Sequence, residues 1–160
     1  MKKADTWKTF EKAMMNCDYS YDIYFRMAVI DEYLNGRGDI WDLYSKMQQI
    51  RCSRNNQIPR NMIDHKQEFM ELIQNFKLFG FDFDQPILVN KTGHIIDGAH
   101  RMACALYFQV PSISLYTDKN YEDFTPEIYD KKWFEEHLKE CIPYAEKQKE
   151  MIRRRYHVQK

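Results

Sequence analysis

The second half of the chain contains a succession of short extended patterns and one helical pattern, and this succession limits the possible folds. Pro86–Val89 is short and fully apolar, as a buried strand is, and Asn90–Gly93 has the composition of a turn. His94–Ile96 gives a second strand, so the two strands are predicted to form a hairpin. Gly98–Phe108 has a helical pattern, and Val110–Tyr116 alternates apolar and polar residues as a strand does. This order predicts a compact α+β core built on a small sheet.

Helical patterns surround this core. Apolar residues recur at helical spacing from Asp5 to Cys52, interrupted by a turn at Asn35–Gly38. The pattern from Asp64 to Phe79 predicts a further helix, and Gly80 follows at the position where a glycine commonly ends a helix. Near the other end of the chain, an amphipathic patch over residues 133–138 precedes a polar helix. We therefore expect packed helices on both sides of the sheet segment.

These patterns predict three parts of the chain. Residues 1–56 are expected to form a helical N-terminal extension. Residues 57–118 form the α+β core, and residues 119–160 form a helical C-terminal extension packed on that core.

Composition and charge narrow the function classes. The 160 residues include 24 basic and 24 acidic side chains, so there is no net electrostatic attraction to DNA or to an anionic membrane. The run Arg153–Arg155 is predicted to be a solvated helix end. No apolar run approaches the roughly 18 residues of a membrane span. The first residues read as a helix rather than a signal segment, and the four cysteines lack metal-binding or redox spacing. We expect a cytoplasmic protein with reduced thiols.

The segment that can carry chemistry lies between the second strand and the helix of the core. It consists of Asp97, Gly98, Ala99, His100 and Arg101. Glycine lets the backbone turn and lets a ligand come close, and the first amides of a helix are ready donors for phosphate. An arginine there can donate two parallel hydrogen bonds to a phosphate, and a histidine can donate one more. The alternative is a plain turn in which Asp97 caps the helix and the side chains of His100 and Arg101 are solvated.

The pattern from Pro86 to Arg101, continued by Val110–Ile113, resembles the ParB/sulfiredoxin superfamily. In that superfamily a P-I-x-V strand is followed by a hairpin and by a D-G-x-H-R or G-C-H-R helix start. The similarity covers roughly Gln57 to Tyr116 and includes the helix that ends at Gly80. It implies a nucleotide-binding ParB/sulfiredoxin-like fold with helical extensions.

The branches of the superfamily differ at the motif. Sulfiredoxins carry at the position of Ala99 a cysteine that is essential for reducing a cysteine sulfinate, so the resemblance excludes that reaction. Partition-type ParB proteins carry an arginine-rich motif and a helix-turn-helix domain, for which the segment after Tyr116 is too short. The free serine kinase branch carries D-G-H-H-R, and this chain is most similar to it, with Ala99 in place of the first histidine.

The resemblance therefore implies an ATP- or other nucleotide-dependent kinase acting on a small hydroxyl-bearing metabolite, with Mg²⁺ bound through the nucleotide and Asp97. Asp97 and His100 are the expected catalytic residues. The family's catalytic glutamate has no counterpart here, so Asp64 is the nearest candidate base, with N-capping of its own helix as the alternative. Arg60 is a candidate phosphate contact or a solvated surface residue. No protein cluster of metal ligands is expected.

Three functions remain open at this stage. The first is the phosphotransferase, whose partners are a nucleotide and a small-molecule substrate. The second is a non-catalytic, nucleotide-responsive regulatory module whose helical flanks contact a partner protein. The third is a DNA-associated ParB-like protein, against which the neutral charge and the missing helix-turn-helix argue.

Overall fold

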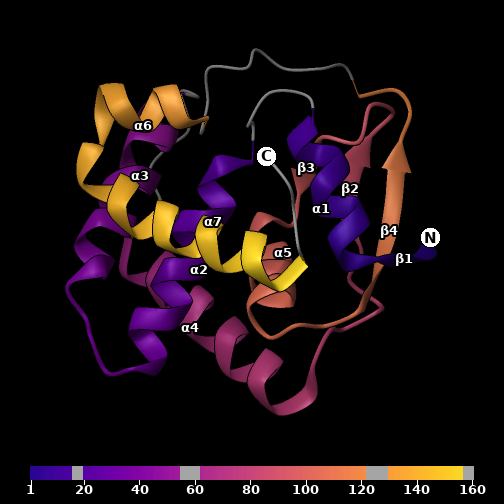
Figure 1. The fold of residues 1–160 in the computed structure, drawn as a ribbon, viewed down its shortest axis with the longest axis horizontal. Coiled ribbons are helices and arrows are strands. Elements are labelled where there is room, and N and C mark those ends of the chain that lie inside the picture. The colour runs from indigo at the N-terminus through magenta and orange to yellow at the C-terminus, as the bar shows by residue number, and fades with distance from the viewer. Residues whose placement is uncertain (16–19, 55–61, 122–129, 157–160) are drawn as a thin grey trace.

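The structure, a computed structural model, describes residues 1–15, 20–54, 62–121 and 130–156 (Figure 1). Within these ranges it has seven α-helices, one short 3₁₀ helix and one four-stranded mixed sheet. The helices are α1 (Thr6–Met15), α2 (Tyr21–Leu34), α3 (Ile40–Arg54), α4 (Met62–Phe79), α5 (Ala99–Tyr107), α6 (Lys131–His137), η1 (Lys139–Cys141) and α7 (Ile142–Tyr156). The strands are β1 (Lys2–Asp5), β2 (Ile87–Asn90), β3 (Ile95–Asp97) and β4 (Ser112–Asp118). The α+β class is as predicted.

The sheet has the strand order β1-β4-β2-β3. The predicted hairpin is present: β2 and β3 pair antiparallel, with an irregularity between Leu88 and Val89. The side chain of Asn90 fixes the turn, because its Oδ1 accepts hydrogen bonds from the backbone N–H groups of Thr92 (3.1 Å) and His94 (2.9 Å). After the hairpin the chain crosses through α5 and returns as β4, which lies parallel to β2.

The N-terminal segment is predicted to be helical, but the structure also contains a strand there. Residues 2–5 form β1, which pairs antiparallel with β4 and places Ala4 opposite Ile113. Four residues are too few to show an alternating pattern, so no local signal marks this strand. It forms because β4 presents an open edge whose backbone groups need partners.

Helix α2 lies at the centre of the helical side of the molecule, between α5 and α7 (Figure 1). Its residues are buried without interruption from Tyr21 to Ile30. A helix that is buried on every side belongs to the interior of a protein rather than to its surface. The N-terminal segment therefore supplies the central helix of the core. The boundary predicted at residue 56 falls outside the described residues.

The other predicted elements lie close to their expected positions. Helix α4 ends at Phe79, and Gly80 follows with a φ of 76° and an N–H donated to the carbonyl of Phe76. Trp133 and Phe134 of α6 are buried, and α7 packs along α2. None of the helices in the described ranges combines the length and the apolar character needed to cross a bilayer.

Candidate functional site

The candidate site begins where β3 gives way to α5. Gly98 takes the N-cap position of α5 in the left-handed region, with a φ of 105°. Its carbonyl accepts the first hydrogen bond of the helix, from the N–H of Met102 at 2.8 Å. The amides of residues 99–101 therefore have no acceptor inside the helix and point toward its N-terminal end. The cap is a glycine, so the alternative in which Asp97 caps this helix does not describe the structure.

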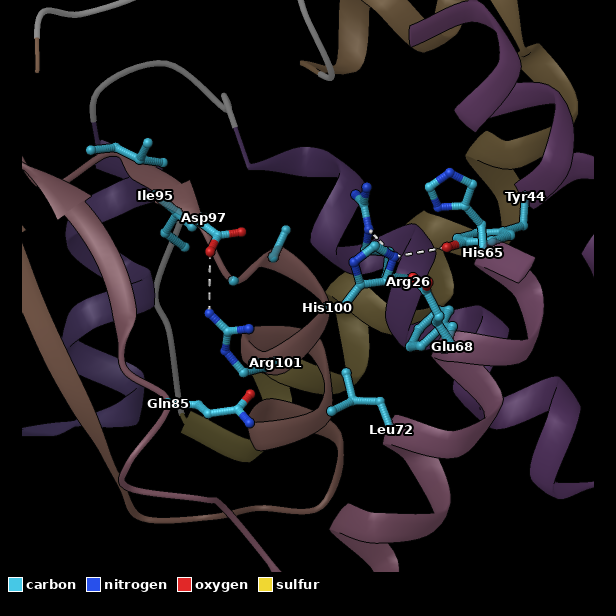
Figure 2. A pocket seen from close by; sticks show the side chains of 14 residues that line it. Arg26, Tyr44, His65, Glu68, Leu72, Gln85, Ile95, Asp97, His100 and Arg101 are labelled. Carbon is cyan, nitrogen blue, oxygen red and sulfur yellow. Dashed lines mark hydrogen bonds and ion pairs between the residues drawn. The ribbon is translucent and has the colours of Figure 1, made fainter. Parts of the chain in front are cut away.

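This helix start opens into a cavity of about 390 Å³ (Figure 2). All five residues of the predicted motif line it: Asp97, Gly98, Ala99, His100 and Arg101. The remaining lining residues are Arg26, Tyr44, His65, Glu68, Phe69, Leu72, Gln85, Ile95 and Ile96. His100 and Arg101 thus share one cavity, as an anion site built from both of them requires.

His100 is held by side chains from α2 and α3. Its Nε2 accepts a hydrogen bond from Nε of Arg26 at 3.3 Å and lies 2.9 Å from the Tyr44 hydroxyl (Figure 2). The ring of Phe69 packs edge-on against the imidazole, with 4.6 Å between centroids. Because arginine can only donate, Nε2 must be an acceptor, and the ring proton belongs on Nδ1. In this tautomer the hydrogen-bond donor of the imidazole is Nδ1–H.

Arg26 is itself part of a buried ion pair. Its side chain is 2 % exposed and pairs with Asp22, four residues earlier on α2, whose side chain is 7 % exposed. Gln48 of α3 extends the network by donating from Nε2 to the Tyr44 hydroxyl at 3.3 Å. A charge pair removed from water holds its geometry firmly, because breaking it leaves an uncompensated buried charge. The wall of the cavity is thus anchored in the molecular core.

Arg101 lies on the opposite side of the helix start from this network. Its Nη2 donates to the carbonyl of Pro86 at 3.0 Å and lies 3.5 Å from Oδ2 of Asp97 (Figure 2). The Asp97 side chain is 68 % exposed, and an exposed pair at this distance contributes little energy. The guanidinium can therefore exchange this contact for a ligand oxygen while the carbonyl of Pro86 keeps it in place.

Two candidate residues from the sequence are not placed in the site. Arg60 and the side chain of Asp64 lie outside the described residues. One helical turn after Asp64, however, Glu68 brings an exposed carboxylate to the cavity wall opposite Asp97 (Figure 2). Sequence reasoning missed Glu68, although it shares a helix face with Leu72, another lining residue.

Sequence reasoning also missed the contributions of the N-terminal helices and of His65. Arg26 did carry a signal: it interrupts a run of apolar residues and follows Asp22 by one helical turn. His65 also lines the cavity, and the sequence analysis assigned it no role in the site. Tyr44 carried no signal beyond its place on an apolar helix face, because only the tertiary packing brings α3 to α5. No group of three or more potential metal ligands occurs among the residues that the structure describes.

Comparison of the chain with protein-family models, with curated proteins and with solved structures finds no match in any of the three.

Proposed function

We propose that this chain is a ParB/sulfiredoxin-like nucleotide-binding protein that transfers a phosphoryl group from a nucleotide to a small hydroxyl-bearing metabolite. One observation carries the proposal. The helix-start amides, His100 and Arg101 line the same cavity as two carboxylates, those of Asp97 and Glu68. Phosphoryl transfer needs donors that neutralise the transferred group and a carboxylate that orients the acceptor.

The phosphate would lie over the first turn of α5. The positive end of the helix dipole and the first-turn amides favour an anion there. Arg101 would add one or two charge-assisted hydrogen bonds, and His100 would add one from Nδ1–H. Gly98 allows the ligand to approach the backbone, since this position carries no Cβ.

The two carboxylates would have different roles. Glu68, on the α4 side of the cavity, is the group that we assign to the acceptor hydroxyl, in place of Asp64. Asp97 is exposed beside Arg101, and its oxygens are of the type that Mg²⁺ prefers. When a nucleotide brings Mg²⁺ with it, Asp97 would hold that ion and leave Arg101 for the phosphate.

The order of elements supports the family resemblance. A hairpin (β2–β3), a helix that begins at the motif (α5) and a further strand (β4) follow one another in the order that the resemblance implies. Because the superfamily has branches without kinase activity, this order supports the nucleotide-binding class more strongly than it supports catalysis.

The buried network that contacts His100 favours a second function. Through Arg26 and Tyr44, the imidazole is connected to α2 and α3. A ligand that moves His100 would therefore act directly on the helical side of the molecule. A nucleotide-responsive regulatory module without turnover would use this connection to signal to a partner protein.

Thermal shift with ATP and Mg²⁺ tests the binding site. At about 100 times its dissociation constant, ATP should add roughly 2.7 kcal/mol, which for a chain of this size raises Tm by roughly 5–10 °C. Arg101→Ala should abolish the shift. Arg37→Ala, which removes an exposed arginine that does not line the cavity, should leave the thermal shift unchanged. A full shift in the Arg101→Ala protein would contradict the site assignment.

Glu68 separates the two functions. For a kinase, Glu68→Gln should retain the ATP shift and lower phosphoryl transfer to pooled hydroxyl metabolites about 100-fold. Glu71→Gln is the matched control, because Glu71 lies on the same helix but does not line the cavity. Binding of ATP without transfer by the parent protein would favour the regulatory module.

A further inference from the structure

A second cavity adjoins the candidate site. It measures about 490 Å³ and is lined by Leu72, Asn75, Phe76, Phe79, Gly80, Phe81, Asp82, Gln85 and Arg101. Three of these residues also line the first cavity: Leu72, Gln85 and Arg101. The two cavities are therefore adjacent, and the side chain of Arg101 lines both of them.

The second cavity has aromatic walls. Phe76 and Phe81 are buried and pack edge to face, with 5.9 Å between ring centroids. Phe79, the last residue of α4, differs from them because this residue is 80 % exposed. The chain direction at this residue is fixed, since α4 ends here and Gly80 turns the backbone away with a φ of 76°. An aromatic ring held at the rim of a cavity presents a face on which a flat ligand group can stack.

Polar groups accompany these aromatic rings. The side chains of Asn75 and Gln85 are exposed and provide amide donors and acceptors, and Asp82 provides a carboxylate. Sites for flat heteroaromatic groups combine apolar walls with a few hydrogen-bonding groups of this kind. An aliphatic ligand would use the apolar walls but would leave the amides without partners.

We propose that this second cavity holds the base of the nucleotide whose phosphates lie at the start of α5. The inference rests on the proposed function and adds to it the place where the base of the nucleotide binds. Arg101 lies at the junction, where its guanidinium contacts the phosphate chain. Phe79 stacks on the base, and the amides of Asn75 and Gln85 face the edges of the base.

ATP and inorganic tripolyphosphate, each with Mg²⁺, distinguish the two subsites by titration calorimetry. The parent protein should bind ATP more tightly than tripolyphosphate, which lacks a base. Phe79→Ala should weaken ATP binding about tenfold, as loss of one base–aromatic stack does, and should leave tripolyphosphate binding unchanged. Phe79→Trp keeps a stacking face and should retain the affinity for ATP.

Leu78→Ala provides the matched control, because Leu78 is the preceding residue, is 70 % exposed and does not line the second cavity. It should change the binding of neither ligand. Equal affinities for ATP and tripolyphosphate, both insensitive to Phe79→Ala, would overturn the base subsite and leave the phosphate site standing. Failure of both ligands to bind the parent protein would overturn the proposed function, and the base subsite with it.

Discussion

The backbone conformation of Gly98 affects both the stability of the fold and the position of Arg101 in the site. Its φ of 105° is one that side-chain-bearing residues rarely adopt, and a Cβ there would lie 3.2 Å from Cγ1 of Ile87 and from Nη2 of Arg101. Gly98→Ala should lower the free energy of unfolding by about 1–2 kcal/mol, the cost of a left-handed conformation for an L-residue. It should also weaken ATP binding by displacing Arg101. Urea unfolding and calorimetry measure the two effects.

Gly38→Ala serves as the comparison for Gly98. Gly38 has no positive φ, and a Cβ there would meet nothing within 4 Å. Its replacement should change the free energy of unfolding by less than about 0.5 kcal/mol. Equal effects at the two positions would show that the conformation at Gly98 is not strained for alanine.

The tautomer of His100 is a second residue-scale prediction. Since Nε2 accepts from Arg26, the ring nitrogen that carries the proton should be Nδ1. Two-bond ¹H–¹⁵N correlation spectra of the imidazoles distinguish the tautomers directly. His137 gives an internal reference, because its Nδ1 lies 2.9 Å from the carbonyl of Trp133, which can only accept. A proton found on Nε2 of His100 would contradict the proposed donor to phosphate.

At the scale of elements, α5 is supported at both ends. Its N-terminal end faces the cavity, and its C-terminal end receives a hydrogen bond from Arg155 of α7 to the carbonyl of Leu106. The solvated helix end predicted for Arg153–Arg155 is therefore wrong for Arg155, which is half-buried. A cation at a helix C-terminus stabilises it through the last carbonyls and the helix dipole.

Arg155→Ala should consequently lower the free energy of unfolding by about 1 kcal/mol. Arg154→Ala is the control, because the Arg154 side chain is 79 % exposed and pairs with Glu150 of its own helix at 3.4 Å. Its effect should stay below about 0.5 kcal/mol. Chemical denaturation of the two variants beside the parent measures the difference, and equal losses would contradict the role of Arg155.

At the scale of the whole molecule, Glu146 connects three helices. It accepts hydrogen bonds from Tyr21 of α2 (2.9 Å) and from Lys131 of α6 (3.1 Å), and it lies on α7 itself. Burial alone would raise the pKa of Glu146, but the hydrogen bonds from Lys131 and Tyr21 and the nearby lysine charges outweigh it. They hold the pKa below the ordinary value of 4.5.

Because the folded state lowers this pKa, Glu146 stabilises the protein above about pH 4.5, and this contribution is lost as the pH falls through the folded-state value. Glu146→Gln should cost at most about 1 kcal/mol at pH 7, since the group is partly exposed, and the cost should shrink below pH 4.5. Unfolding measured from pH 7 to pH 3 checks this. Glu136→Gln, at an exposed position on α6, should show no such convergence.

Much of the sheet segment followed from local signals. The turn at Asn90–Gly93, the glycine that ends α4 and the glycine that begins α5 each mark a place where the backbone must change direction, and such places are visible in a sequence. A helix start at Gly98, one residue before the observed start at Ala99, was predicted for the same reason, and with it the positions of His100 and Arg101. Five residues in a row at one helix end must lie near one another.

The rest of the candidate site could not be predicted, because its residues are distant in the sequence. Arg26, Tyr44 and Glu68 come from three other helices, and nothing in their own surroundings indicates which helix will pack beside α5. Strand β1 could not be predicted for the same reason, since its partner β4 lies more than a hundred residues further along the chain.

The local order of elements around Gly98, and the positions of His100 and Arg101 after it, follow from the sequence alone. Tertiary packing, by contrast, places α2 at the centre of the helices and lets its buried Arg26 fix the imidazole of His100. It alone brought Glu68 to face Asp97 across the cavity. The physical reason is that turns, caps and periodicity depend on neighbouring residues, whereas packing depends on which apolar faces of the whole chain fit together.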